Sequence, residues 1–261
     1  MTLRLTPRAQ YLSIFSLANS AVQEYAFPLF VKGKNDMHKP RPYTPNTGLL
    51  LTVFTSILSL HVLLFTGCLN SSSSKKLGDG HDFGENDRDV VLVLGDSISA
   101  GGFSGGAPWP ARFANMVGKR VVNDSVGGAT ASVGASRVQG GLNTHKPGFL
   151  IIFYGANDAI QGVDVNATEN ALRAMVSAAK ANQTIPVMAT VMPMEGGRRI
   201  YNGRVDRINE SIRSIASQER VKLVNLHRTF RGKEDEYFVD GLHPNDRGEE
   251  LIALEFLDAF K

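Results

Sequence analysis

The sequence contains a single cysteine, Cys68, among 261 residues. One cysteine excludes a disulfide within the chain and any zinc site built from several cysteines. Two of the six histidines, His145 and His227, lie beside expected strands, but neither has a partner at metal-ligand spacing. The composition therefore gives no reason to expect a structural metal.

An excess of charge of one sign is missing from most of the chain. The formal net charge is +3, but residues 1–68 hold six basic and two acidic residues. The remaining residues hold 22 basic and 23 acidic side chains. Without a basic surface to neutralise phosphates, this larger part of the chain is not expected to bind nucleic acid.

Only one stretch, residues 49–65, is a long apolar run, and its 17 residues fall at the lower limit for a membrane-spanning helix of ~20 residues. A short basic segment at 37–41 precedes it, and Thr66, Gly67 and Cys68 follow, which is the order of an export signal. The ending resembles the lipobox of bacterial lipoproteins, with Phe65 where leucine is usual. The alternative is an uncleaved N-terminal anchor.

The lipoprotein interpretation assigns the first third of the chain. Residues 37–68 are then a signal peptide that starts at Met37 and ends at Cys68, and residues 1–36 are a non-native upstream extension. Residues 69–88, rich in Ser, Gly and charged residues, are expected to form a flexible linker. The protein would face the periplasm as an outer-membrane lipoprotein, held to the membrane by a lipid on Cys68.

Residues 89–261 have the pattern of one α/β domain, and their 173 residues suffice for a single core. Apolar stretches alternate with segments of helical period, which predicts a parallel sheet with helices on both faces. In such sheets, functional groups gather beyond the carboxyl ends of the strands. The expected strands are 90–94, 121–122, 149–154, 185–191 and 221–226, and the expected helices are 109–117, 166–182, 204–218 and 246–260.

Polar segments follow the first three expected strands. Ser97, directly after the first strand, is placed like a nucleophile, although this segment alone favours a helix N-cap without chemistry. Gly127 and Gly128 follow the second strand, where they either aim a backbone N–H at a ligand or form an ordinary turn. Asn157 follows the third strand and either donates its amide to a developing oxyanion or bonds the local backbone.

A fourth polar segment near the C-terminus contains Asp240 and His243. Over one turn of backbone, the carboxylate can reach Nδ1 of the ring and leave Nε2 facing outward. A serine nucleophile needs this combination of a base and an orienting acid. A turn closed by Asp and Pro is the alternative for this segment alone, but the four segments in this order are not ambiguous together.

The four segments, GDSIS, NDSVGG, GAND and DGLHP, resemble the four blocks of the SGNH (GDSL) hydrolases, and the resemblance covers essentially all of 89–261. It is closest to the periplasmic bacterial group of multifunctional thioesterases, lysophospholipases and arylesterases. The resemblance implies a three-layer α/β/α sandwich around a flavodoxin-like, parallel five-stranded sheet. An ordinary α/β-hydrolase is excluded, because position 99 is Ser where its nucleophile elbow needs Gly.

The resemblance also implies a role for each matching residue. Ser97 is the nucleophile, His243 is the general base and then the general acid, and Asp240 orients the histidine. The oxyanion hole consists of the backbone N–H of Ser97, the backbone N–H of Gly128 and the side-chain amide of Asn157. For the glycine, the spacing in the family favours position 128 over position 127, which is the fallback.

We therefore expect a serine esterase that hydrolyses short- to medium-chain acyl esters, thioesters or lysophospholipids through an acyl-serine intermediate, without a metal or cofactor. The alternatives are a carbohydrate O-acetylesterase of the same superfamily and a non-catalytic lipoprotein that binds envelope components. Loops at 102–107, 162–166 and 193–197 are rich in small residues, which suits a shallow groove and short acyl chains. We expect a monomer whose only partners are a small-molecule ester and the membrane.

Overall fold

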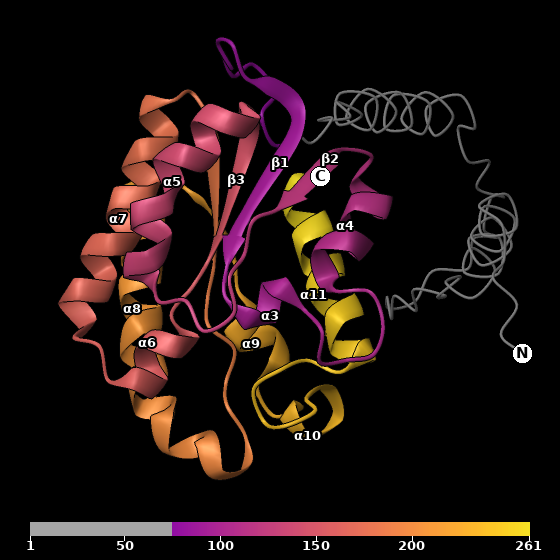
Figure 1. Cartoon of the computed structure of the whole chain (residues 1–261), viewed down its shortest axis with the longest axis vertical. Coiled ribbons are helices and arrows are strands. Elements are labelled where there is room, and N and C mark those ends of the chain that lie inside the picture. Colours follow the sequence, from indigo (N-terminus) through magenta and orange to yellow (C-terminus); the bar gives the residue numbers. More distant parts are fainter. Residues whose placement is uncertain (1–74) are drawn as a thin grey trace, which may run out of the picture. The chain divides into compact units, whose positions relative to one another are not determined.

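The computed structural model describes residues 75–261, and its centre is a sheet of five parallel strands (Figure 1). The order across the sheet is β2-β1-β3-β4-β5. This is the flavodoxin-like order, so the expected fold class is confirmed. The strands are β1 (Asp87–Gly95), β2 (Arg120–Asn123), β3 (Pro147–Phe153), β4 (Ile185–Ala189) and β5 (Lys222–Val224).

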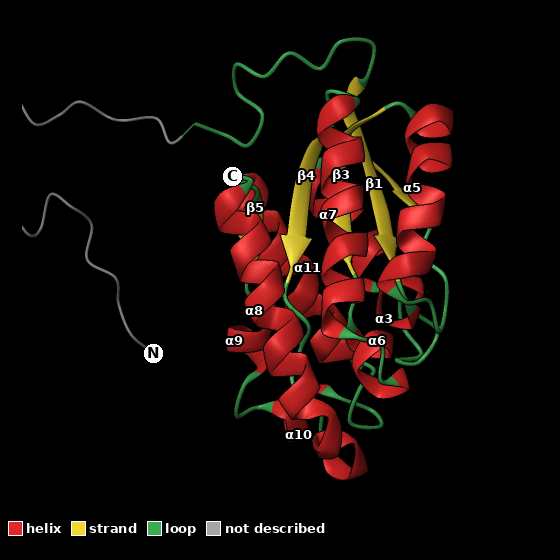
Figure 2. Ribbon diagram, turned by 90° about the vertical axis from the view of Figure 1, so that its left-hand side faces the viewer, coloured by secondary structure: helices red, strands yellow, loops and turns green. Residues whose placement is uncertain are grey.

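The long helices form the two outer layers of the sandwich (Figures 1 and 2). Helices α4 (Trp109–Val117) and α11 (Asp246–Phe260) pack together on one face of the sheet. Helices α5 (Ala131–His145), α7 (Val165–Ala181) and α8 (Asn202–Gln218) cover the other face. The short helices are α3 (Ser97–Ala100), α6 (Ala156–Gln161), η1 (Gly196–Tyr201), α9 (Leu226–Phe230) and α10 (Glu234–Tyr237).

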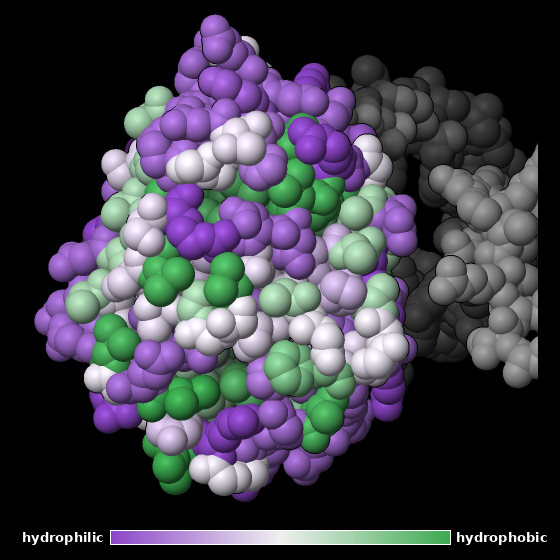
Figure 3. Space-filling model, in the orientation of Figure 1, coloured by the Kyte–Doolittle hydropathy of each residue, from purple (hydrophilic) through white to green (hydrophobic). Residues whose placement is uncertain are grey.

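The core explains why the strands are continuous apolar runs. Residues 90–94 of β1 are completely buried, because helices cover both faces of the sheet. On the α4–α11 side, the rings of Trp109 and Phe256 stack with their centroids 4.4 Å apart. The outer face seen in Figure 3 carries its hydrophobic residues in several separate groups among hydrophilic ones, as on most soluble domains.

The ordered domain begins before residue 89, which corrects the expected linker boundary. Leu77 and Phe83 pack against the core, and the Phe83 ring lies 5.5 Å from that of Phe149. The Asp82 carboxylate accepts a hydrogen bond from the Gly84 N–H, which closes a turn at Phe83. Residues 75–88 have the polar composition of a linker, but the two apolar side chains attach them to the domain.

The other assignments of the N-terminal third fall on residues that the structure does not describe. These are the extension 1–36, the signal peptide 37–68 with Cys68, and residues 69–74 of the expected linker. Among residues 75–261, no helix is both long and apolar enough to cross a membrane.

Among the long helices of residues 75–261, α5 is the one for which the sequence pattern sets no bounds, and glycines are the reason. A side chain at Gly134 would come within 2.5 Å of the Tyr154 ring, and one at Gly141 within 2.8 Å of Leu92. Both positions therefore need glycine for close packing on the sheet. Glycine lowers helix propensity and interrupts the apolar stripe by which a helix is recognised.

The N-terminus of α4 is capped from another helix by a buried carboxyl group. Oε2 of Glu249, on α11, accepts a hydrogen bond of 2.7 Å from the Trp109 N–H. Glu249 is only 1% exposed, and this burial raises its pKa to about 7, although the Trp109 N–H and the Arg112 charge partly oppose the shift. The folded protein therefore holds a proton on Glu249 that the unfolded chain has already released at pH 5 to 7.

Replacement of Glu249 by glutamine is expected to stabilise the protein more at pH 8 than at pH 5. The raised pKa of Glu249 makes the wild type lose up to ~3 kcal/mol of stability as the pH rises from about 4.5 to 7. Glutamine keeps an oxygen for the Trp109 N–H and does not ionise. Urea unfolding of both proteins at pH 5 and pH 8 measures the difference. A stability difference that is equal at both pH values, or larger at pH 5, contradicts the prediction.

Candidate active site

The candidate site lies at the carboxyl edge of the sheet, beside the point where the strand order reverses. Strands β2 and β3 flank β1, so a crevice is expected where the chain leaves β1. Ser97 stands at this place, as the first residue of α3. The carboxylate of Asp96 caps α3 by accepting a hydrogen bond of 2.9 Å from the Ile98 N–H. Ser97 is therefore free to use its own hydroxyl group elsewhere.

The structure brings Ser97, His243 and Asp240 together in one row. The Ser97 Oγ lies 2.9 Å from Nε2 of His243, and Nδ1 of the same ring lies 2.9 Å from Oδ2 of Asp240. Oδ1 of Asp240 accepts hydrogen bonds from the backbone N–H groups of His243, at 2.9 Å, and Leu242, at 3.1 Å. The carboxylate therefore fixes both the ring and the backbone that carries it.

The turn that holds Asp240 and His243 depends on Gly241. This residue has φ +79°, and a Cβ on it would lie 2.4 Å from the Glu195 carbonyl oxygen. The Glu195 N–H also donates a hydrogen bond of 2.8 Å to the Gly241 carbonyl. The turn that carries Asp240 and His243 is thereby attached to the segment that leads into η1.

Arg198, from η1, also belongs to the site, and the sequence alone did not indicate a role for it. Its Nη1 lies 2.9 Å from Oδ2 of Asp240 and donates a hydrogen bond of 3.0 Å to the Asp240 carbonyl. Burial works to raise the pKa of Asp240, but hydrogen bonds from the His243 N–H, from Arg198 and from the His243 ring outweigh it and hold that pKa well below its usual range. Asp240 therefore stays ionised at every pH at which the protein would work.

Asn157 and Asp158 lie in the first turn of α6, directly after β3. Gly155 makes the sharp turn between strand and helix with φ +121°. The buried Asp158 carboxylate accepts hydrogen bonds from the Ala131 N–H, at 3.0 Å, and the Thr168 hydroxyl, at 2.9 Å. Asp158 thus ties three helices together, and Asn157 is left at the edge of the sheet.

The glycine turn and Asn157, the two candidate oxyanion-hole elements besides Ser97 itself, lie close to each other. A Cβ on Gly127 would lie 4.0 Å from the Ser97 Cβ, so the glycine turn passes beside Ser97. Gly128 has φ +76°, with nothing within 4 Å of the position its Cβ would take. Nδ2 of Asn157 donates a hydrogen bond of 3.2 Å to the Ala129 carbonyl, which connects Asn157 to the same turn.

Asp96 is the second unusual carboxyl group at the site. It is 1% exposed, and this burial raises its pKa to about 7, with a further contribution from the charge of Asp158. The Ile98 N–H and the Asn157 amide partly oppose the shift, because both stabilise the carboxylate. Asp96 therefore links the strand end that carries Ser97 to the amide of Asn157.

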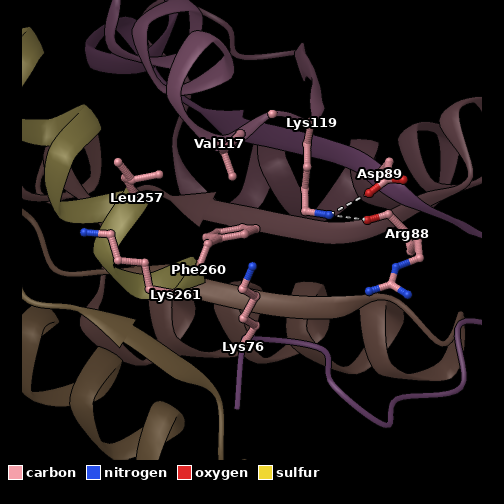
Figure 4. A pocket seen from close by; sticks show the side chains of 9 residues that line it. Lys76, Arg88, Asp89, Val117, Lys119, Leu257, Phe260 and Lys261 are labelled. Carbon is pink, nitrogen blue, oxygen red and sulfur yellow. Dashed lines mark hydrogen bonds and ion pairs between the residues drawn. The ribbon is translucent and has the colours of Figure 1, made fainter. Parts of the chain in front are cut away.

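A separate cavity of about 410 Å³ lies at the opposite edge of the sheet (Figure 4). The Lys119 amine sits in it and donates to the Arg88 carbonyl and to Oδ1 of Asp89. The side chains of Phe260 and Leu257 supply an apolar part of the wall. Its lining contains no serine, histidine or cysteine, so this cavity has no pair of a serine nucleophile and a histidine base. Within residues 75–261, no cluster of His, Cys, Asp and Glu side chains has the arrangement of a metal site.

The chain is similar in sequence to proteins of known activity. Residues 93–251 match the model of the GDSL-like lipase/acylhydrolase family. The chain is 31% identical over 170 residues to thioesterase 1/protease 1/lysophospholipase L1 of Escherichia coli K12. This alignment covers 63% of this chain and 80% of that protein. The chain is 29% identical over 171 residues to an arylesterase of Vibrio mimicus, with coverage of 62% and 84%.

Solved structures support the fold. The crystal structure of TesA has a TM-score of 0.59 at 24% identity and covers 66% of this chain and 98% of its own. An acetylxylan esterase from Geobacillus stearothermophilus has a TM-score of 0.59 at 19% identity, with coverage of 67% and 95%.

Proposed function

Because the chain belongs to the GDSL-like lipase/acylhydrolase family, it is a hydrolase of ester bonds, and we propose that it is a serine esterase for short- to medium-chain acyl esters and thioesters. The observation that carries this proposal is the row of hydrogen bonds from Ser97 through His243 to Asp240. It gives the serine a base and gives the base an orienting carboxylate, which is the arrangement that acyl transfer through a serine requires.

The proposed reaction has two steps that use the same residues. Nε2 of His243 takes the proton of the Ser97 hydroxyl while Oγ attacks the ester carbonyl carbon. The N–H groups of Ser97 and Gly128 and the amide of Asn157 stabilise the oxyanion, and one such donor is typically worth ~3 kcal/mol. His243 then gives its proton to the leaving alcohol or thiol. In the second step it activates a water molecule that releases the acyl group from Ser97.

The proposed classes of ester come from the relatives, and the proposed preference for short acyl chains comes from the loops of this chain. The names of the relatives from Escherichia coli and Vibrio mimicus refer to thioesters, lysophospholipids and aryl esters. The loops 102–107 and 193–197 are rich in glycine, which favours a shallow groove. Acetyl esters of glycans remain the second candidate, because the same fold carries an acetylxylan esterase.

A series of p-nitrophenyl esters from acetate to palmitate, offered to the purified full chain, tests the proposal. We expect the highest kcat/KM between acetate and octanoate. A fluorophosphonate should label the protein once, with the phosphonyl group on the peptide that contains Ser97. A maximum at palmitate overturns the chain-length assignment, and release of acetate from acetylated xylan alone favours the glycan esterase. Absence of both hydrolysis and labelling favours a non-catalytic binding protein.

We also propose that the chain is exported and held to the outer membrane as a monomer by a lipid on Cys68. The support is the sequence order of basic segment, apolar run, Thr66, Gly67 and Cys68. An unmodified peptide that spans Gly67 and Cys68, found by mass spectrometry of the membrane fraction, contradicts this proposal.

A further inference from the structure

The catalytic histidine is covered on one face by an aromatic ring for which the family resemblance provides no role. The Phe103 ring stacks on the imidazole of His243 with a centroid distance of 3.5 Å and an angle of 6° between the planes. Phe103 belongs to the loop between α3 and α4, six residues after Ser97. The ring is 45% exposed, whereas His243 beneath it is 8% exposed.

The backbone of this loop accounts for the position of the ring. Gly101, Gly102 and Gly105 all have positive φ angles, of 80°, 99° and 74°. A Cβ on Gly101 would lie 2.4 Å from Cβ of Pro108, so the two ends of the loop pass very close to each other. The loop is therefore folded back over the site, and it places Phe103 on the histidine although half of that ring remains in solvent.

The stacking geometry suits a charged imidazole better than a neutral one. Two neutral aromatic rings prefer an offset or an edge-to-face contact, because their negative faces repel each other. A centroid distance of 3.5 Å with nearly parallel planes leaves little room for offset. A positive charge over a ring face is attracted instead. In the proposed reaction, His243 gains such a charge when it takes the proton of Ser97, in the transition state and the tetrahedral intermediate.

The remaining sides of the imidazole have other partners. Its two nitrogens face Ser97, from α3, and Asp240, from the same turn. The charged group behind Asp240 is Arg198, from η1. Phe103 thus supplies a contact of a different kind, which keeps the ring plane aligned between serine and carboxylate and excludes water from one face.

We propose that Phe103 is a positioning residue for the proposed reaction, and that its stacking favours the protonated form of His243 that occurs during acyl transfer. Interactions that are stronger in the transition state than in the ground state raise kcat. The stacking should therefore appear in kcat rather than in KM, even for an acyl group as small as acetyl, which has little surface of its own to contact the ring.

The test compares Phe103→Ala, Phe103→Leu, Phe103→Tyr and Phe103→Trp in the full chain, with p-nitrophenyl acetate as the substrate. We expect alanine and leucine each to lower kcat by about tenfold with little change in KM, and tyrosine and tryptophan to restore most of the loss. Phe83→Ala is the matched control, because the Phe83 ring contacts His81 at the opposite edge of the sheet, 4.7 Å from ring to ring. It should leave kcat unchanged.

Three results overturn the proposal. Full activity of Phe103→Leu would show that any apolar cover is enough, and a loss that appears only in KM would make Phe103 a substrate contact. The inference rests on the proposed function, so the wild type is tested first for fluorophosphonate labelling at Ser97. Absence of that labelling rejects the esterase itself, whereas a normal wild type with an unaffected Phe103→Ala variant rejects only the role of Phe103. Thermal unfolding of each variant identifies any that fails to fold.

Discussion

Ser97→Ala is expected to lower kcat/KM for p-nitrophenyl acetate on the order of 10⁵-fold, because it removes the atom that forms the acyl intermediate. The residual activity would come from the oxyanion donors and from binding. The fold should survive the change. The Ser97 hydroxyl bonds only His243 among the described contacts, and the cap of α3 is made by Asp96 rather than by the serine. A loss of activity with an unchanged unfolding midpoint is therefore the expected pattern.

Two other serines serve as controls for this variant. Ser136→Ala changes an exposed hydroxyl on α5 that bonds the Val133 carbonyl and should leave kcat/KM unchanged. Ser125→Ala tests a serine on the segment that also carries Gly128. If Ser97→Ala keeps more than a hundredth of the wild-type rate while Ser125→Ala loses it, the nucleophile has been assigned to the wrong residue.

The sequence predicted the fold well wherever local patterns decide the structure. Residues 109–117 and 246–260 were expected as helices and are α4 and α11 with the same bounds. Their apolar residues repeat with helical period, and their ends carry clear signals, such as Asn245, whose side chain caps α11 by accepting from the Gly248 N–H at 3.0 Å. Strands β1, β3 and β4 were found because they are buried and read as continuous apolar runs, whereas β2 and β5 are short and only partly buried.

The sequence failed where distant packing overrides the local pattern. Helix α5 carries Gly134 and Gly141 because the sheet lies too close for side chains, and that closeness is invisible in a local window. The same holds for the linker, in which Leu77 and Phe83 look isolated among polar residues until the core that receives them is known.

In the candidate site, too, the contacts that are local in sequence could be predicted more easily than the distant ones. Asp240 and His243 are three residues apart, so their contact follows from the backbone of one turn and could be predicted from spacing. The contact of Ser97 with His243 spans 146 residues, and only the parallel sheet and the family resemblance made it predictable. Arg198 and Phe103 reach the site from η1 and from a loop, and no spacing rule connects either residue with His243.

Asp240→Asn is expected to lower kcat on the order of 10³- to 10⁴-fold, because an amide cannot replace a carboxylate that only accepts hydrogen bonds. Oδ1 accepts from the N–H groups of Leu242 and His243, and Oδ2 faces the His243 ring and Arg198. If the amide oxygen stays on the backbone side, its NH₂ group faces Nδ1 and the guanidinium. Nδ1 must then give up its proton, Nε2 carries one, and the ring no longer accepts from Ser97.

The pKa of Asp240 sets the pH range over which Asp240→Asn is expected to lower kcat. The pKa of Asp240 lies well below its usual range, so the carboxylate is ionised throughout pH 5 to 9. A lowered pKa stabilises the folded state above the unfolded pKa of ~3.9, and this stabilisation disappears only as the pH falls through the lower, folded value. Asp240→Asn should therefore lower kcat at pH 5 as well as at pH 9, because the carboxylate that it removes is ionised at both pH values.

Arg198→Gln is the matched variant, because it removes the neighbouring cation and leaves the carboxylate on the histidine. It should cost about tenfold or less in kcat, since the half-exposed pair between Arg198 and Asp240 is screened by solvent. An Asp240→Asn protein within tenfold of the wild type, or one whose loss equals that of Arg198→Gln, would mean that His243 is held in its working tautomer by something other than Asp240. The large difference expected between the two variants follows from their positions: Asp240 touches the proton-carrying ring, and Arg198 acts only through Asp240.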